Sequence, residues 1–128
     1  MSFLKNIFGS SEAPKQNTSK VNWIELNDLA QLQEIVTLSE QNPVAIFKHS
    51  TRCSISRMAL KQFENEFDSE EKVTPYFLDL LEHRDISNEI ASRFGVMHQS
   101  PQLIVIKNRE AVYHVSHSDI DAEALKNL

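Results

Sequence analysis

The chain has 128 residues, 41% of them hydrophobic, and a formal net charge of −5 at pH 7. This length and hydrophobic content suit one domain with its own core, and the acidic balance argues against nucleic acid as a partner. No apolar run is long enough to cross a bilayer, and the start lacks the features of a signal peptide, so we expect a cytoplasmic protein.

The first twenty residues differ in composition from the rest. Residues 9–20 are polar, almost free of large apolar side chains, and interrupted by Pro14. Such a segment cannot bury enough surface to fold alone. We therefore expect a flexible leader over residues 1–20 and one folded domain over residues 21–128.

The domain begins with a predicted strand, helix and strand. Alternating apolar and polar residues predict a strand over Val21–Leu26, and Asn27 or Asp28 can cap the next helix. That helix ends before Pro43, and Val44–Phe47 is a short apolar run typical of a buried strand. The buried face of the helix is expected to carry Leu29, Leu32, Ile35, Val36 and Leu38.

A cysteine follows this strand at the start of a second predicted helix. The polar segment Lys48–Arg52 predicts a loop, and Cys53 opens a helix that runs to about Phe67. Its apolar residues recur at helical spacing, at Ile55, Ala59, Phe63 and Phe67. A thiol there faces unpaired backbone N–H groups and the positive end of the helix dipole, which favour the reactive thiolate.

A third strand and helix come next. Val73–Leu80 predicts a strand, and the missing N–H of Pro75 near its start suggests a sheet edge or a strand entry. A helix over Arg84–Phe94 is predicted to end at Gly95.

The chain closes with a predicted hairpin and helix. Leu103–Lys107 and Ala111–Val115 predict antiparallel strands joined by a tight turn, and a last helix begins at Ser118 or Asp119. The order β-α-β-α-β-α-β-β-α implies an α/β fold with a mixed sheet and right-handed crossovers.

Cys53 is the only cysteine in the chain. If it attacks a disulfide, no internal thiol can resolve the mixed disulfide that forms, so an external thiol must do so. A free cysteine is usually a buried apolar residue. Here the helix start and the flanking cations Lys48, Arg52 and Arg57, with His49, favour a reactive thiolate. Five scattered histidines and one cysteine indicate no metal site, and we assign no role to His98, His114 and His117.

Two stretches, F-K-H-S-T-R-C-S-I-S and Q-S-P-Q-L-I-V-I-K-N, together with the order of elements, resemble the monothiol bacilliredoxins of the thioredoxin-like superfamily. The resemblance implies a three-layer α/β/α sandwich and an oxidoreductase that removes bacillithiol from proteins carrying it as a mixed disulfide. It implies that Cys53 is the nucleophile and that Pro101 is a cis proline beside it. It also implies no tightly bound cofactor, bacillithiol as co-substrate, and a flavin-dependent disulfide reductase as a candidate partner.

Three positions depart from related patterns. Ser54 stands where this family commonly has proline, which would loosen the first helical turn slightly. Ser56 replaces the resolving cysteine of dithiol thioredoxins, and Phe47 replaces their buried aspartate. The last two differences argue against dithiol chemistry.

Several polar residues beside Cys53 are candidates for the site. The Ser56 hydroxyl can donate to the thiolate, or it is an ordinary helix-surface serine. Arg52 and Arg57 can hold the malate carboxylates of bacillithiol bidentately, or they are solvated surface charges. Lys48 and His49 can act similarly or tune the thiolate, although His49 is more often a loop or strand-end histidine that makes a local hydrogen bond.

The remaining candidates come from the second half of the chain and from two methionines. A cis bond would aim the Ser100 backbone at an extended substrate. Ser118 and Asp119 are similar to a pair that holds the cofactor thiol in glutaredoxins, and a simple helix cap is the alternative. Met58 and Met97 can form an apolar rim, but packing in the core is favoured.

Two other functions remain open from the sequence. One is a non-catalytic redox-sensing or thiol-carrying adaptor, which would be modified once without turnover. The other is an arsenate-reductase-like enzyme, since the spacing of Cys53, Ser56 and Arg57 also occurs there. That chemistry needs further arginines, and Arg84, Arg93 and Arg109 are not evidently placed for it.

Overall fold

The structure is a computed structural model that describes residues 21–69 and 71–128; the predicted leader over residues 1–20 lies outside these ranges. In chain order the elements are β1 (Ile24–Glu25), α1 (Gln31–Leu38), β2 (Val44–His49), α2 (Ser54–Glu66), β3 (Thr74–Asp79), α3 (Arg84–Phe94), β4 (Gln102–Lys107), β5 (Glu110–Ser116) and two 3₁₀ helices, η1 (His117–Asp119) and η2 (Ala122–Asn127).

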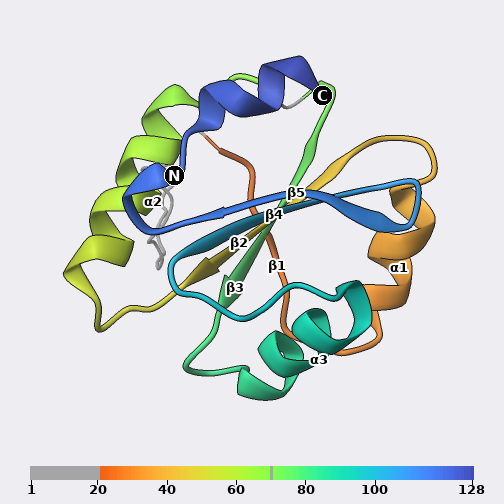
Figure 1. Cartoon of the computed structure of the whole chain (residues 1–128), viewed down its shortest axis with the longest axis horizontal. Coiled ribbons are helices and arrows are strands. Elements are labelled where there is room, and N and C mark those ends of the chain that lie inside the picture. Colours follow the sequence, from red (N-terminus) through yellow and green to blue (C-terminus); the bar gives the residue numbers. More distant parts are fainter. Residues whose placement is uncertain (1–20, 70) are drawn as a thin grey trace, which may run out of the picture.

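The strands form one mixed sheet in the order β1-β3-β2-β4-β5 (Figure 1). β1 and β2 both run parallel to β3, because a helix connects each strand to the next. β4 is antiparallel to β2, and β5 is antiparallel to β4. The predicted mixed sheet is confirmed, and β2 lies at its centre.

Each face of this sheet carries its own hydrophobic core. Alternate residues of β2 point to opposite faces, so Val44 and Ile46 pack with residues of α1 and α3, whereas Ala45 and Phe47 pack with residues of α2 and η2. Figure 1 shows α2 and the C-terminal 3₁₀ helices on the opposite side of the sheet from α1 and α3. The predicted α/β/α sandwich is therefore confirmed.

Four local predictions are also confirmed. α3 covers the predicted residues, and Gly95 follows it with a φ of 67°, the left-handed conformation that glycine adopts without strain. Pro75 is the second residue of β3, at the strand entry. Asn108 and Arg109 both have positive φ, 52° and 73°, as the tight turn between antiparallel strands requires.

The predicted first strand and first helix are longer than the observed ones. Pairing with β3 covers only two residues of the predicted Val21–Leu26 strand. α1 begins at Gln31, so Leu29 lies in the preceding turn and Leu38 ends the helix. Both leucines are exposed, 45% and 41%, and the prediction that they are buried is wrong.

The central strand is longer than predicted. Lys48 and His49 were expected in a loop, but both belong to β2 and are buried. They stay in the strand because its ladder continues, with Lys48 opposite Leu78 and His49 opposite Asp79 on β3.

The predicted last helix is two 3₁₀ helices instead. η1 contains Ser118 and Asp119, and η2 is capped by Asp121, whose Oδ1 accepts the N–H of Glu123 at 2.9 Å. The alternative role of Ser118 and Asp119 as a helix cap is therefore wrong, because the cap lies at Asp121. Ile120 is buried in the core cluster that contains Ala45 and Phe47 of β2.

Candidate functional site

Cys53 stands at the junction of the central strand and α2. β2 ends at His49, and after a loop of three residues Cys53 is the N-cap of α2, with extended backbone at φ −108° and ψ 121°. Its N–H donates to the carbonyl of Ser50 at 3.2 Å, and its own carbonyl accepts the N–H of Arg57 at 3.0 Å. The side chain is partly exposed. The predicted order of strand, loop and cysteine at a helix start is confirmed.

Ser56 lies behind Cys53 and is fully buried. Its Oγ accepts the N–H of Ser50 at 3.0 Å and lies 2.8 Å from Nδ1 of His49. The alternative that Ser56 is an ordinary surface serine is therefore wrong. The serine ties the loop before Cys53 to the first turn of α2.

The imidazole of His49 lies inside the molecule on the same face of the sheet as α2. Its ring centroid is 5.5 Å from that of Phe77. Burial lowers the pKa of His49; Asp79 and Glu64 act to raise it, and Arg57 lowers it further. The neutral ring is thus favoured at neutral pH. The alternative of a strand-end histidine with a local hydrogen bond is confirmed, since His49 is the last residue of β2 and its Nδ1 lies 2.8 Å from Oγ of Ser56.

Two arginines flank Cys53 at the surface. Arg52 and Arg57 are both exposed, and Nη1 of Arg57 donates to the carbonyl of Thr51 at 3.1 Å. The hydrogen bond holds the Arg57 guanidinium against the loop that precedes the thiol. Cations at these positions are available to an anionic substrate.

A second loop lies beside the first one and carries the proline. Since Lys48 of β2 pairs with Gln102 of β4, the preceding Pro101 lies near the point where the Cys53 loop begins. The Ser100–Pro101 peptide bond is cis, as predicted. The buried side chain of Gln102 braces this loop, because its Nε2 donates to the carbonyl of Met97 at 3.0 Å. Sequence reasoning missed Gln102, although a glutamine inside an apolar strand signals a polar partner.

Ser100 has a buried hydroxyl with no hydrogen-bond partner among residues 21–69 and 71–128. A buried polar atom without a partner is uncommon in folded proteins.

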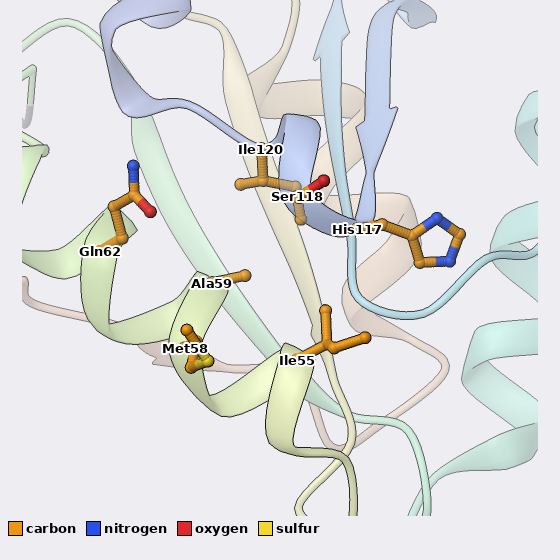
Figure 2. Close-up of a pocket in the computed structure, with 7 residues that line it drawn as sticks. All are labelled: Ile55, Met58, Ala59, Gln62, His117, Ser118 and Ile120. Carbon is orange, nitrogen blue, oxygen red and sulfur yellow. The ribbon is translucent and has the colours of Figure 1, made fainter.

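A mostly apolar pocket of about 240 Å³ lies between α2 and η1 (Figure 2). Ile55 follows Cys53 by two residues and faces His117 and Ser118 across this pocket. The full lining is Ile55, Met58, Ala59, Gln62, His117, Ser118 and Ile120. The N–H of His117 donates to the carbonyl of Pro101 at 3.0 Å, which joins the pocket wall to the proline loop.

The pocket corrects several predictions. Ile55 was expected on the buried face of α2 but is 52% exposed, because it lies at the rim of the pocket. Met58 and Met97 are 72% and 79% exposed, so the favoured role in the core is wrong for both. His117 received no role from the sequence, and its place at the end of β5 was the only available signal. Asp119 is exposed in η1, beside Ser118.

Lys48 occupies the opposite face of the sheet from His49. Its Nζ donates to the carbonyl of Ser87 at 3.4 Å and lies 3.3 Å from Nδ1 of His98. Burial lowers the pKa of Lys48 from 10.5 to about 8. The ammonium is enclosed by α3 and the proline loop rather than presented to solvent, so it does not act as a surface anion site.

Residues 21–69 and 71–128 contain no group of three or more His, Cys, Asp or Glu side chains that could hold a metal ion. None of the helices in these ranges has the length and apolar character of a membrane span.

A thiol at the start of the helix after the central strand, with a cis proline before the neighbouring antiparallel strand, defines a thioredoxin-fold protein with one redox cysteine. The fold agrees with solved structures. A protein assigned as an oxidoreductase with a thioredoxin fold is 34% identical, with a TM-score of 0.69 over 81% of this chain and 90% of that one. Two thioredoxins share the fold at lower identity. Malassezia sympodialis thioredoxin is 18% identical, with a TM-score of 0.66, over 88% of this chain and 91% of that one. Mitochondrial thioredoxin 3 of Saccharomyces cerevisiae is 17% identical, with a TM-score of 0.63, over 82% and 91%.

The chain belongs to the monothiol bacilliredoxin family. The family model described as monothiol bacilliredoxin BrxC matches residues 24–125, nearly the whole described domain. This membership gives the protein a thiol redox role, with bacillithiol-related thiols as partners.

Proposed function

We propose that this protein removes bacillithiol from proteins that carry it as a mixed disulfide. The Cys53 thiolate attacks the bacillithiol sulfur, the target's S–S bond breaks, and the target thiolate leaves and takes a proton from solvent. The product is a mixed disulfide between Cys53 and bacillithiol. Free bacillithiol then attacks the bacillithiol sulfur of this mixed disulfide, which restores the Cys53 thiolate and forms bacillithiol disulfide. A flavin-dependent disulfide reductase would reduce the bacillithiol disulfide.

The observation that carries this proposal is the solitary thiol at the N-terminus of α2. Cys53 is partly exposed there, and the buried serine one turn later, Ser56, cannot form a disulfide with it. A thiol in this position can start an exchange but needs an external thiol to complete it. Such a cycle suits a small-molecule thiol of a reducing cytoplasm, which is where we place the protein.

The surroundings of Cys53 supply groups for both parts of the substrate. The exposed guanidinium groups of Arg52 and Arg57 complement the carboxylates of the malate moiety. Ser118 and Asp119 are exposed on η1 and offer hydrogen bonds to the remainder of bacillithiol. The cis Pro101 loop, with the backbone of Ser100, would receive the extended backbone of the target protein.

The apolar pocket supports a protein as the second part of the substrate. Bacillithiol is a polar sugar thiol with a malate group, whereas the exposed lining of the pocket includes the large apolar side chains of Ile55 and Met58. Methionine surfaces adapt to different apolar side chains, which suits a protein that acts on several targets.

The arsenate-reductase alternative loses support in this structure. Arg93 forms an ion pair with Glu89 at 3.2 Å, and Arg109 forms one with Glu40 at 3.1 Å. Both guanidinium groups are thus engaged in ion pairs of their own.

The proposal is tested by incubating a bacillithiol-modified protein with the wild type or with Cys53→Ala, in the presence of free bacillithiol, and following the loss of the adduct by mass spectrometry. We expect the wild type to release many equivalents of target thiol per chain. Cys53→Ala should be no faster than buffer, while the neighbouring Ser54→Ala serves as a matched control and should retain turnover.

Two results would contradict the proposal. Equal rates for the wild type and Cys53→Ala would remove Cys53 from the chemistry. Release that stops at one equivalent per chain, even with free bacillithiol, would identify the adaptor that is modified once.

A further inference from the structure

A buried pair of polar side chains, His49 and Ser56, lies behind the thiol. Nδ1 of His49 is 2.8 Å from Oγ of Ser56, and the two residues are 5% and 0% exposed. Ser56 and Cys53 share the first turn of α2. We propose that His49 is a positioning residue which, through the hydroxyl of Ser56, controls how well the site stabilises the Cys53 thiolate. This regulation rests on the proposed function only in taking Cys53 as the reacting group.

The argument begins with the single proton of the Ser56 hydroxyl. Its oxygen already accepts the N–H of Ser50 at 3.0 Å, and the side chain is fully buried. When His49 is neutral with Nδ1 unprotonated, the hydroxyl proton is held toward the ring, because a buried donor without an acceptor is costly. In this state Ser56 has no proton to offer the sulfur.

Protonation of His49 reverses this hydrogen bond. Nδ1 then carries a proton and donates to Oγ of Ser56, which already accepts from Ser50. The hydroxyl proton must turn to another acceptor, and the N-cap and third residue of a helix face each other across its first turn. Cys53 is the N-cap of α2 and Ser56 is its third residue, so in this proposal the sulfur of Cys53 is that acceptor. A protonated His49 therefore adds both a hydroxyl donor and a nearby positive charge to the thiolate.

Burial favours the neutral form of the His49 ring although two carboxylates oppose it, so a further negative charge near the ring would favour its protonation. Asp79 lies on β3, Glu64 and Arg57 lie on α2, and the uncharged ring of Phe77 packs alongside. Glu64 is itself engaged, because its Oε2 accepts the indole N–H of Trp23 at 2.7 Å. In this proposal the Cys53 thiolate supplies that further charge, so the thiolate and the protonated imidazole stabilise each other reciprocally.

The first test measures this linkage by NMR titration of the His49 ring in four proteins: wild type, Cys53→Ala, Ser56→Ala and the double variant. Removing the thiol should lower the pKa of His49 by about one unit, a tenfold change in its protonation equilibrium. In the Ser56→Ala background the same removal should have a clearly smaller effect. The exposed His114 on β5 is the internal control and should titrate identically in all four. The proposal would be overturned if the pKa of His49 were the same with and without the Cys53 thiol. It would also be overturned if removing the thiol had the same effect on that pKa in the Ser56→Ala background.

The second test uses the pH profile of Cys53 alkylation in the wild type and in His49→Gln. Glutamine keeps an oxygen for the Ser56 hydroxyl but does not titrate. The variant should react about threefold to tenfold more slowly than the wild type near pH 6, where the charged imidazole contributes, and equally fast near pH 9. A constant ratio at both values would indicate a purely structural role and overturn the proposal. Neither test uses bacillithiol, so their failure is distinguishable from failure of the proposed function.

Discussion

Adjacent residues of β2 place two titratable side chains on opposite faces of the sheet. His49 points toward α2 and Cys53, whereas Lys48 points toward Ser87 of α3 and His98. Burial lowers the pKa of both groups, since neither is compensated by a buried carboxylate in direct hydrogen-bond contact. Burial at the end of the central strand therefore disfavours the charged form of both groups, although Lys48, with a pKa of about 8, is still charged at pH 7.

Lys48 gives a prediction about stability and pH. Its pKa is about 8 in the folded protein and 10.5 in the unfolded chain, so the unfolded chain binds more protons between these values. Deprotonation of Lys48 should therefore increase the free energy of unfolding of the wild type as the pH rises from 8 to 10.5. Below pH 8 the buried ammonium lowers the stability by its full cost. Lys48→Met removes that cost. The difference in free energy of unfolding between Lys48→Met and the wild type should therefore favour the variant more at pH 7 than at pH 10.

Urea unfolding at pH 7 and pH 10 checks this prediction. The control is Lys61→Met, on the exposed side of α2, whose difference from the wild type should not depend on pH. A pH-independent difference for Lys48→Met would show that the lysine is charged throughout.

At this scale, the sequence predicted Cys53 and Pro101 but misjudged their neighbours. Cysteine at a helix start and proline before a strand are visible in a local pattern. The burial of Lys48 is not, because Ser87 and His98 come from distant segments. The burial of Ser56 depends on how the loop after β2 folds back against α2. Polar residues after an apolar run read as a loop unless their partners are known.

α2 is the element that combines chemistry with recognition. Its N-terminus carries Cys53, one face packs Ala59 and Phe63 into the core, and the other exposes Ile55 and Met58 beside the pocket. An exposed apolar rim next to a reacting thiol suits a surface that receives a protein.

Met58→Glu tests whether this rim receives the target protein. We expect it to slow release of bacillithiol from a modified protein by about fivefold to tenfold, because part of the roughly 1.5–3 kcal/mol of methionine burial is lost. The rate of reaction with a small disulfide should change by less than about twofold, since a small molecule does not have to contact Met58 in order to reach Cys53. Rates on both substrates are compared by mass spectrometry and by thiol release.

Val112→Glu, which replaces an exposed apolar residue on β5, is the matched control and should leave both rates unchanged. Equal slowing of the protein and the small disulfide by Met58→Glu would contradict the docking role.

Elements with strong periodicity were predicted well and short ones poorly. α3 matches its prediction because Arg84–Phe94 has a clear apolar face and Gly95 ends it. The last predicted helix is two 3₁₀ helices, because a few apolar residues near Ile120 fit either geometry. The length of β1 depends on pairing with β3, which no local pattern reports.

Across the whole molecule, the sheet brings together three segments that are far apart in the sequence. β2 leads to Cys53, β4 follows the Pro101 loop, and β5 leads to His117, which binds the carbonyl of Pro101. Functional sites at the carboxyl ends of parallel strands in α/β sheets have this origin. The fold class and the thiol were predictable, whereas the pocket was not, since its two walls meet only after folding (Figure 2).

The central claim is that a single thiol begins an exchange that only an external thiol can finish. The most direct measurement mixes a bacillithiol-modified protein with the reduced wild type, without any other thiol, and follows both proteins by intact mass spectrometry. The account predicts that at most one equivalent of target is released per chain, that the bacillithiol mass appears on Cys53, and that added bacillithiol clears it and restarts release. Continued release beyond one equivalent without added thiol, or target release with no adduct on Cys53, would contradict the account.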